Sequence, residues 1–261
     1  MTGLVHEVYA IRFAENPSGT RGHYFLGTAG TPADEPAPLN YYFFVLRSAE
    51  GDILVDCGFT SEKAAEWNRP HFAEPWDAAR WLDIDPATVP LIVLTHLHFD
   101  HVGGLRGFPA ADIVLQEEEI AFWTGKAATR SEIAHLGSLP DLHTVLDRVY
   151  EGKVRFVRGD AQVTDGVWVH SVPGHTPGSQ AVRVRTASGD LLLAGDAAHF
   201  YEEVEQSHPF SIFTDLVQMY DSFDLMNSLV PAGRVIPGHD PRVFERHPAV
   251  PGLEGRVVRI A

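Results

Sequence analysis

The chain has 261 residues, of which 44% are hydrophobic and 21% charged, so it can bury a sizeable core and does not have the composition of a disordered protein. Its length suits one α/β domain better than two, and we expect residues 1–261 to form a single domain. The formal net charge of −15 argues against a nucleic-acid partner, because proteins that bind nucleic acids usually carry a basic surface.

The sequence has no feature typical of a secreted or membrane-spanning protein. The one cysteine, Cys57, has no partner for an intramolecular disulfide, which suits a reducing compartment. Residues 1–11 lack the apolar run of a signal peptide, and no segment approaches the roughly 18 apolar residues of a transmembrane helix. We therefore expect a cytoplasmic protein that has no membrane partner.

In the first half of the chain, predicted strands and helices alternate. Residues 41–46 and 53–55 are rich in β-forming side chains and flank a turn at 50–52, which predicts a β-hairpin. A helix is expected at 116–123, where three early glutamates suit the positive end of the helix dipole. The other elements expected here are two tryptophan-rich helices, two short buried strands, and a stretch of helix and loop, at 62–67, 76–82, 91–94, 112–115 and 126–146.

The second half begins with strands. Residues 153–158, 167–172 and 180–185 alternate between apolar and polar side chains, which predicts three antiparallel strands. A turn at Gly189 and Asp190 leads into another strand. The remaining elements are this strand, an amphipathic helix and a last short strand, at 191–194, 213–229 and 234–236.

The two halves repeat one pattern. Residues 47–55 match residues 185–193 in residue type, position by position. Each predicted hairpin is followed by a short strand that ends near a histidine, His96 in the first half and His239 in the second. The repetition predicts two similar β–α halves, whose sheets would pack face to face with helices on the outside.

The densest chemical signal is the segment 94–104, which directly follows a predicted buried strand. Four side chains of metal-ligand type, His96, His98, Asp100 and His101, fall within six residues. The two histidines at 96 and 98 point to the same side of an extended chain, and the glycine pair that ends the segment allows close packing. Four such side chains exceed the needs of one tetrahedral ion, so we expect two metal ions to share this loop.

Three more candidate ligands stand in the second half, each directly after a glycine and each near the end of a predicted strand. They are His175 in Pro-Gly-His-Thr-Pro-Gly, Asp196 in Ala-Gly-Asp, and His239 in Pro-Gly-His-Asp. A glycine permits close approach of the backbone to an ion. Nitrogen-rich ligands favour zinc, although manganese, iron and cobalt bind the same types of side chain.

This series of motifs resembles that of the metallo-β-lactamase superfamily, and within it the N-acyl-homoserine lactonase-type hydrolases. The resemblance covers the chain from about Tyr41 to His239 and implies an α/β fold of the αββα sandwich type. It also implies a distribution of ligands between two divalent ions. His96, His98 and His175 would hold the first ion; Asp100, His101 and His239 would hold the second; and Asp196 would bridge them.

Two positions separate the chain from other members of the superfamily. Asp196 stands where the dizinc β-lactamases carry a cysteine, and His98 stands where the diiron flavoproteins carry a glutamate. Both differences favour hydrolysis over redox chemistry and over the cleavage of β-lactam antibiotics. The hypothesis is a lactone or ester hydrolase in which a metal-bridging hydroxide attacks the carbonyl and Asp100 moves its proton.

One position departs from the lactonases. These enzymes usually carry a tyrosine three residues after the bridging aspartate, where this chain has His199. His199 could donate the same hydrogen bond to the substrate carbonyl, or Tyr201 could reach the site instead. Alternatively, His199 could lie behind the ligands or simply be exposed. Asp56 is expected to brace the site from outside the ligand set, and Cys57 to be a small buried residue.

Aromatic side chains outside the predicted core strands could line a substrate pocket or pack between helices. These are Trp67, Trp76, Trp81, Phe122, Trp123, Phe200, Tyr201, Phe210 and Phe213. The expected partner is a small lactone or ester, and the chain could also form a homodimer.

Three other functions fit the same ligands. A thioesterase of the glyoxalase II type shares all seven but usually carries a basic C-terminal helical extension, whereas about 20 residues follow His239 here. A phosphoester hydrolase of the nuclease kind would normally need a basic surface or a further domain. A metal-binding sensor without catalysis would show no metal-dependent turnover of esters.

Overall fold

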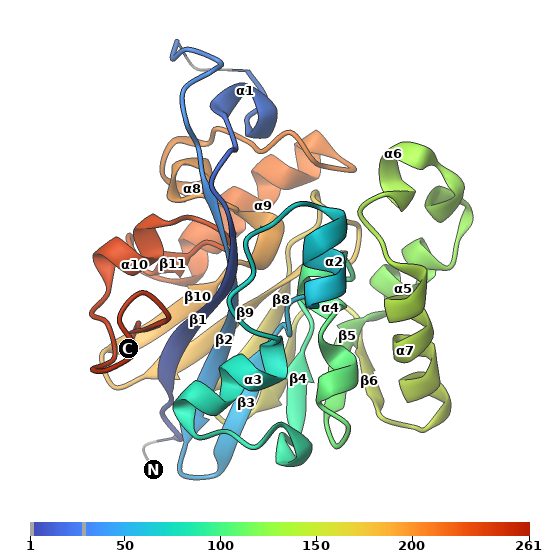
Figure 1. The fold of residues 1–261 in the computed structure, drawn as a ribbon, viewed down its shortest axis with the longest axis vertical. Coiled ribbons are helices and arrows are strands. Elements are labelled where there is room, and N and C mark those ends of the chain that lie inside the picture. The colour runs from blue at the N-terminus through green and yellow to red at the C-terminus, as the bar shows by residue number, and fades with distance from the viewer. Residues whose placement is uncertain (1–2, 28–29) are drawn as a thin grey trace.

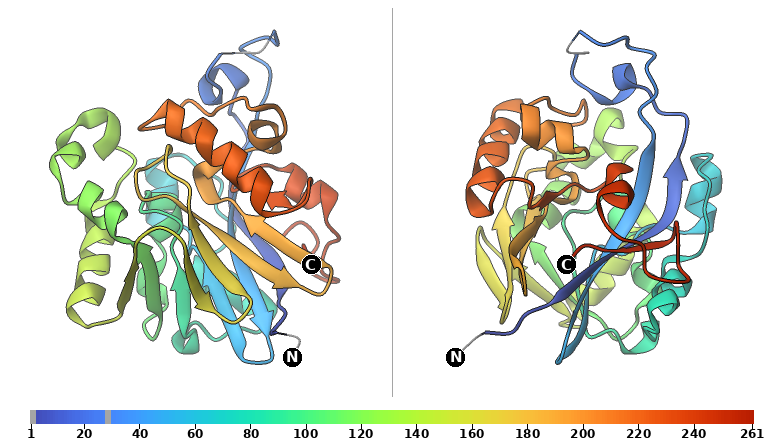
Figure 2. Two further views of the ribbon diagram at one scale, coloured as in Figure 1. Left: turned by 180° about the vertical axis from the view of Figure 1, so that it is seen from behind. Right: turned by 90° about the vertical axis from the view of Figure 1, so that its left-hand side faces the viewer.

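Two mixed β-sheets pack face to face, with helices on both outer faces (Figures 1 and 2). The computed structural model describes residues 3–27 and 30–261. Within these residues the larger sheet has seven strands in the order β12-β1-β2-β3-β4-β5-β6. Their bounds are β1 (Glu7–Asn16), β2 (Leu39–Ser48), β3 (Gly51–Val55), β4 (Leu91–Val93), β5 (Asp112–Gln116), β6 (Val154–Val157) and β12 (Val257–Arg259).

The smaller sheet has five strands among the described residues, in the order β11-β10-β9-β8-β7. Strands β10 and β11 are parallel, and the other neighbours are antiparallel. Their bounds are β7 (Ala161–Thr164), β8 (Val167–Ser171), β9 (Gln180–Thr186), β10 (Gly189–Leu193) and β11 (Val235–Ile236).

The helices lie outside the two sheets, as the right-hand view of Figure 2 shows for α2 and α3 on one side and α8 and α9 on the other. The predicted helices are present with shifted ends. The longest described helix begins at Leu216 and is capped by Asp215, whose side chain accepts a hydrogen bond from Gln218 N at 3.0 Å. The α-helices are α1 (Arg21–Tyr24), α2 (Ser61–Glu66), α3 (Pro75–Ala79), α4 (Phe99–Val102), α5 (Glu117–Trp123), α6 (Ser131–Ala134), α7 (Leu139–Tyr150), α8 (Tyr201–Gln206), α9 (Leu216–Leu229) and α10 (Arg242–Arg246). The short 3₁₀ helices are η1 (Arg80–Leu82), η2 (Pro86–Thr88), η3 (Leu105–Gly107), η4 (Lys126–Thr129) and η5 (Gly195–Ala197).

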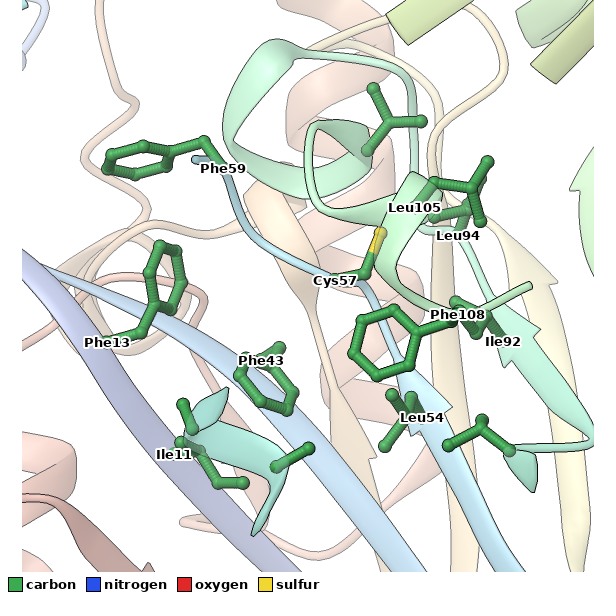
Figure 3. Packing of buried hydrophobic residues seen from close by; sticks show 14 of the residues in the cluster. Ile11, Phe13, Phe43, Leu54, Cys57, Phe59, Ile92, Leu94, Leu105 and Phe108 are labelled. Carbon is green, nitrogen blue, oxygen red and sulfur yellow. The ribbon is translucent and has the colours of Figure 1, made fainter. Parts of the chain in front are cut away.

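Each sheet is buried on both faces, so three apolar layers hold the molecule together. Alternate residues of a strand point to opposite faces, so that Phe43 packs toward α2 and α3 while Phe44 packs between the sheets. Figure 3 shows the outer layer of the larger sheet, in which Leu105 and Phe108 lie beside the Cys57 side chain and Phe13 packs near Phe43 and Phe59. Cys57 is fully buried and free, as the sequence predicts.

The two predicted halves are present and share one topology. In each, an antiparallel hairpin (β2–β3 or β9–β10) is followed by a strand parallel to the second arm (β4 or β11). The repetition in sequence therefore reflects a repeated unit of sheet, and the carboxyl ends of β4, β8, β10 and β11 lead into the loops that carry the candidate ligands.

One predicted pairing is wrong. Residues 153–158 were expected to lie antiparallel to the strands that follow, whereas β6 joins the edge of the larger sheet and runs parallel to β5. The reason is the connection, because α5, α6 and α7 carry the chain back across the sheet between these two strands, and a crossover of this kind produces parallel neighbours.

No described helix is long and apolar enough to cross a membrane.

Candidate metal centre

The seven candidate ligands converge on one edge of the sandwich, although they come from both sheets. His96 and His98 follow β4, and Asp100 and His101 lie in α4. The others follow strands of the smaller sheet: His175 after β8, Asp196 in η5 after β10, and His239 after β11. Strand ends provide a rigid base for such loops, which is why catalytic side chains of α/β proteins gather there.

The structure arranges the seven side chains in two groups that could each hold a metal ion. One group contains His96, His98, His175 and Asp196, and the other contains Asp100, His101, Asp196 and His239. Within each group one potential ligand atom per residue lies within 4.8 Å of all the others. This is the division that the resemblance implies, with Asp196 common to both groups.

The two carboxylate oxygens of Asp196 face different groups. Its Oδ1 lies 3.1 Å from His101 Nε2 and 3.0 Å from His239 Nε2. Its Oδ2 lies 3.5 Å from His175 Nε2 and 3.9 Å from His96 Nε2. A carboxylate in this position can bind one ion through each oxygen.

Several of the converging atoms are buried and have no hydrogen-bond partner within the part of the chain that the structure describes. They are His96 Nε2, His101 Nε2 and Asp196 Oδ1. Unpaired buried polar atoms are costly, by about 1–3 kcal/mol each, and are rare in native proteins. Nitrogen and oxygen donors that meet in this way are what a divalent metal ion requires, so the residues present fit such an ion.

Hydrogen bonds behind the ligands orient the imidazole rings. The Nδ1 atoms of His175 and His239 donate to the carbonyl oxygens of Ile212 and Asn40, at 2.9 and 2.8 Å. Each bond fixes the tautomer in which Nε2 carries a free lone pair toward the centre. The predicted bracing residue Asp56 lies 2.7 Å from His101 Nδ1.

Asp56 also connects two segments behind the site. It accepts hydrogen bonds from Thr95 N at 2.7 Å and Thr95 Oγ1 at 2.8 Å. Its backbone has a φ of 62°, in the left-handed region that residues other than glycine seldom adopt. Strained residues of this kind cluster at functional sites because the surrounding hydrogen bonds hold them in place.

Burial and neighbouring charges divide the ligand histidines into two electrostatic classes. Burial and adjacent imidazoles lower the pKa values of His96 and His98, and burial lowers that of His175 to about 3, so these rings are neutral. Burial also favours the neutral form of His101, but the carboxylates of Asp196, Asp56 and Asp100 outweigh it and raise its pKa. The second group therefore carries the greater density of negative charge, which favours a cation.

The structure adds a positioning residue that sequence reasoning missed. The buried carboxylate of Glu119, in the first turn of α5, accepts four hydrogen bonds. Its Oε1 accepts from Leu97 N at 2.9 Å and Trp123 Nε1 at 2.7 Å, and its Oε2 accepts from Thr176 Oγ1 at 2.6 Å and Gly178 N at 3.2 Å. Glu119 thus connects the His96–His98 loop to the His175 loop. The sequence suggested only a favourable interaction with the helix dipole.

His199 and Tyr201, the two candidates for the role of the lactonase tyrosine, lie in different environments. His199 borders the same cavity as the ligands, with its Nε2 3.1 Å from Asp196 Oδ2 and its ring stacked on Phe210 at 3.5 Å. Tyr201 packs between the sheets beneath Arg246 and does not border the cavity. Burial lowers the pKa of His199, but Asp196 and Glu203 outweigh this and raise it to about 9.

A cavity of about 90 Å³ opens over the metal-ligand groups. Of the predicted aromatic lining, Trp67 and Phe210 border it, and Tyr24, Tyr41 and Phe99 join them. The other predicted aromatic residues pack in the core layers, namely Trp76, Trp81, Phe122, Trp123, Phe200, Tyr201 and Phe213.

A larger cavity of about 260 Å³ lies beside α7 and is bordered by Leu97, Trp123 and Leu142. No titratable side chain borders it, so it offers no group for catalysis.

A family model and a curated relative match most of the chain. The family model described as the metallo-beta-lactamase superfamily matches residues 36–239. An N-acyl homoserine lactonase of Bacillus cereus is 29% identical over 224 residues, which cover 80% of this chain and 81% of that protein.

Two solved structures share the fold. An N-acyl homoserine lactone hydrolase with the product N-hexanoyl-L-homoserine bound at its catalytic metal centre superposes with a TM-score of 0.75 at 23% identity, covering 95% of this chain and 98% of that one. A dizinc quorum-quenching lactonase superposes with a TM-score of 0.70 at 18% identity, covering 91% of each chain.

Proposed function

Because the chain belongs to the metallo-β-lactamase superfamily, we propose that it is a two-metal hydrolase that opens a lactone ring, with N-acyl-homoserine lactones as the first candidates. The observation that carries the proposal is the pair of ligand groups that share Asp196 and face a cavity. The lactonase names of the curated relatives and of the solved structures support the choice of bond.

In this proposal the first ion is held by His96, His98 and His175, the second by Asp100, His101 and His239, and Asp196 is shared. Zinc is the preferred metal, since five of the seven side chains offer nitrogen and a related solved structure is described as dizinc. Two such ions supply Lewis acidity and lower the pKa of water toward neutrality.

The proton is handled by Asp100. This side chain borders the cavity and keeps its Oδ2 3.6 Å from His239 Nε2 and 3.8 Å from His101 Nε2. Asp100 accepts a proton from the attacking water and returns it to the alkoxide that leaves when the ester bond breaks. In a lactone the two products stay in one molecule, a hydroxy acid.

His199 orients the substrate carbonyl. Its ring is fixed by Phe210 on one face and by Asp196 at Nε2, and it borders the cavity. A rigid donor beside the reacting carbonyl stabilises the negative charge that develops on oxygen. In the structure the Nε2 atom of His199 faces Asp196. The same N–H group donates to the substrate carbonyl, so its hydrogen bond is shared between the Asp196 carboxylate and the carbonyl oxygen.

The test is proton release from a panel of lactones by the metal-loaded protein. The panel contains acyl-homoserine lactones of short and long chain together with simple γ- and δ-lactones, and the controls are His98→Ala and Asp100→Asn. Turnover that disappears in both controls supports the proposal. A metal-loaded protein that opens none of these rings contradicts it, and thioesters and phosphoesters become the substrates to examine.

The cytoplasmic location and the homodimer stay predictions from the sequence. Cell fractionation tests the first, and sedimentation of the metal-loaded protein tests the second.

A further inference from the structure

A single arginine borders the cavity over the metal-ligand groups. Arg69 follows α2 and is half-buried, with Trp67, Tyr41 and Asp100 among its neighbours in the wall. Among the described residues its side chain makes one hydrogen bond, from Nε to the Tyr41 hydroxyl at 3.2 Å, and no ion pair. The chain has 35 acidic residues, yet no carboxylate of the described residues forms an ion pair with the two terminal nitrogens of this guanidinium.

The backbone around Arg69 is held firmly. Arg69 N donates to Ala64 O at 2.8 Å, which closes the end of α2, and Asn68 adopts the left-handed conformation with a φ of 51°. The next residue, Pro70, accepts a hydrogen bond from Glu15 N in β1 at 3.0 Å. The position of Arg69 is therefore set before a ligand arrives, and this lowers the entropic cost of using it.

Tyr41 connects Arg69 to the metal-ligand groups. The Tyr41 side chain is buried, and its ring meets the ring of His239 edge-on with the centroids 5.3 Å apart. Its hydroxyl lies at the other end, against Arg69. The Arg69 guanidinium and the second ligand group thus contact opposite ends of the Tyr41 side chain and border the same cavity.

The surroundings of Arg69 call for an anion. Apart from the candidate metal ligands, His199 and His23, the rest of the wall is apolar or aromatic, including Phe99, Leu136, Phe210 and Ile212. A cation in such a wall loses hydration, and a carboxylate that binds the planar guanidinium through two oxygens compensates that loss well. The cavity itself is small, about 90 Å³, against roughly 300–1,000 Å³ for pockets that enclose a drug-sized ligand.

We propose that Arg69 binds a carboxylate of the substrate, so that the preferred substrate is a compact lactone or ester carrying an anionic group remote from the bond that breaks. The inference rests on the proposed hydrolysis and moves its preferred substrate from the uncharged N-acyl-homoserine lactones to lactones or esters that carry a carboxylate. The scissile carbonyl lies over the ligand groups, the carboxylate lies against the terminal nitrogens of Arg69, and Tyr41 fills the space between.

A matched pair of substrates tests the inference. One is a γ-lactone that bears a carboxylate on the ring, and the other bears a primary carboxamide at the same atom. We expect the intact protein to prefer the carboxylate by roughly 10- to 100-fold in kcat/KM, the usual range for a charge-assisted hydrogen bond. In Arg69→Gln the ratio falls to about one.

The matched control is Arg106→Gln. Arg106 is exposed, lies 5.9 Å from the ring of Trp76 just as Arg69 lies 5.9 Å from the ring of Trp67, and does not border the cavity. The Arg106→Gln variant removes the same charge, and its kcat/KM ratio between the carboxylate and carboxamide substrates should equal that of the intact protein. A ratio near one in the intact protein, or a preference that survives in Arg69→Gln, overturns the inference.

A binding measurement separates this inference from the proposed activity. Calorimetry compares glutarate with butyrate on the metal-loaded protein, because the second carboxylate of glutarate can reach Arg69 while the first occupies the ligand groups. Glutarate should bind at least tenfold more tightly, and Arg69→Gln should abolish the difference. If glutarate binds more tightly through Arg69 but no lactone is opened, the anion site is supported and the proposed activity is contradicted. If lactones are opened without any preference for an anionic group, the proposed activity is supported and the inference is contradicted.

Discussion

At the scale of single residues, the position of a side chain relative to Asp196 determines what it can do. The carboxylate offers Oδ1 to His101 and His239 and Oδ2 to His96 and His175, so one side chain joins both ligand groups. His199 approaches Oδ2 from the cavity side at 3.1 Å. His199 therefore contacts a candidate ligand and also borders the cavity that a substrate would enter.

We expect His199→Phe to lower kcat/KM for a lactone by roughly 10²- to 10³-fold, the usual cost of losing one donor to a developing oxyanion. The phenyl ring preserves the stacking on Phe210 but donates no hydrogen bond. Steady-state kinetics with metal analysis of the same preparation measures the effect.

Tyr201→Phe is the control for this prediction, because the Tyr201 hydroxyl is buried outside the cavity and has no hydrogen-bond partner among the described residues. Its activity should match that of the intact protein. Loss of metal from His199→Phe would instead make His199 a residue that holds the site together.

At the scale of elements, the site depends on hydrogen bonds between loops that belong to different sheets. Glu119 on α5 receives donors from the loop after β4 and from the loop after β8. Burial raises its pKa, but the four donors compensate for the buried charge. Without this carboxylate, the loops that present His98 and His175 would lose the bridge that Glu119 makes between them.

Glu119→Gln should weaken metal binding by roughly 10- to 100-fold, the usual effect of removing a hydrogen bond behind a ligand. The amide nitrogen would face donors that it cannot accept from, which should also cost about 1–3 kcal/mol of stability. Competition with a chromophoric chelator measures the affinity. Glu118→Gln, on the exposed neighbour, should bind metal normally; equal affinities in both variants would contradict the assigned role.

A second link between elements attaches α1 to α8. The guanidinium of Arg21 donates to both oxygens of Glu202, at 2.9 and 2.6 Å, and His208 Nδ1 lies 2.6 Å from the same carboxylate. The hydrogen bond from Arg21 lowers the pKa of Glu202 to about 2 from an ordinary value of 4.5. Stabilisation by this carboxylate is therefore complete above pH 4.5 and is lost as the pH falls toward 2.

Glu202→Gln should destabilise the protein by about 1 kcal/mol at neutral pH, the upper part of the range for a partly exposed ion pair. The difference from the intact protein should shrink as the pH falls through the interval between 4.5 and about 2. Urea unfolding at a series of pH values measures it. Glu205→Gln, which breaks a more exposed pair with Arg246, should change stability less; a difference for Glu202→Gln that stays constant with pH would be inconsistent with the assigned pKa.

At the scale of the whole molecule, the candidate metal centre depends on the meeting of two sheets. The larger sheet supplies His96, His98, Asp100 and His101, and the smaller sheet supplies the other three ligands. Neither half has a complete group of its own, since Asp196 of the smaller sheet belongs to both. Bound metal should consequently stabilise the packing of one sheet against the other.

Removal of metal by a chelator should lower the Tm by several degrees. A ligand at 100 times its Kd contributes about 2.7 kcal/mol, and each kcal/mol moves the Tm of a protein of this size by roughly 2–4 °C. Differential scanning calorimetry of the loaded and stripped protein measures the shift. In Asp196→Ala the chelator should have little effect; an unchanged Tm in the intact protein would mean that the sheets do not depend on the ions.

The sequence by itself determined the features that depend on local pattern. Alternation and short apolar runs identified both hairpins and the strands β4, β5, β8, β9, β10 and β11, because these signals reside in a few adjacent residues. The density of ligand-type side chains after a predicted strand identified His96, His98, Asp100 and His101, and a preceding glycine near the end of a strand identified His175, Asp196 and His239; the structure brings these seven together. Asp56, expected to brace the site from outside the ligand set, lies 2.7 Å from His101 Nδ1.

Only the tertiary structure decided which distant segments meet. Strands β1 and β12, near the two ends of the chain, pair with each other at Ala10 and Val258, and the parallel direction of β6 follows from the helices before it. Glu119 and Arg69 acquire their surroundings from loops far away in the sequence, and burial between the sheets separates Tyr201 from the cavity that His199 borders. The physical reason is that pairing, burial and cavity lining are set by contacts between residues remote in sequence, whereas periodicity and turn chemistry act within a few residues of each other.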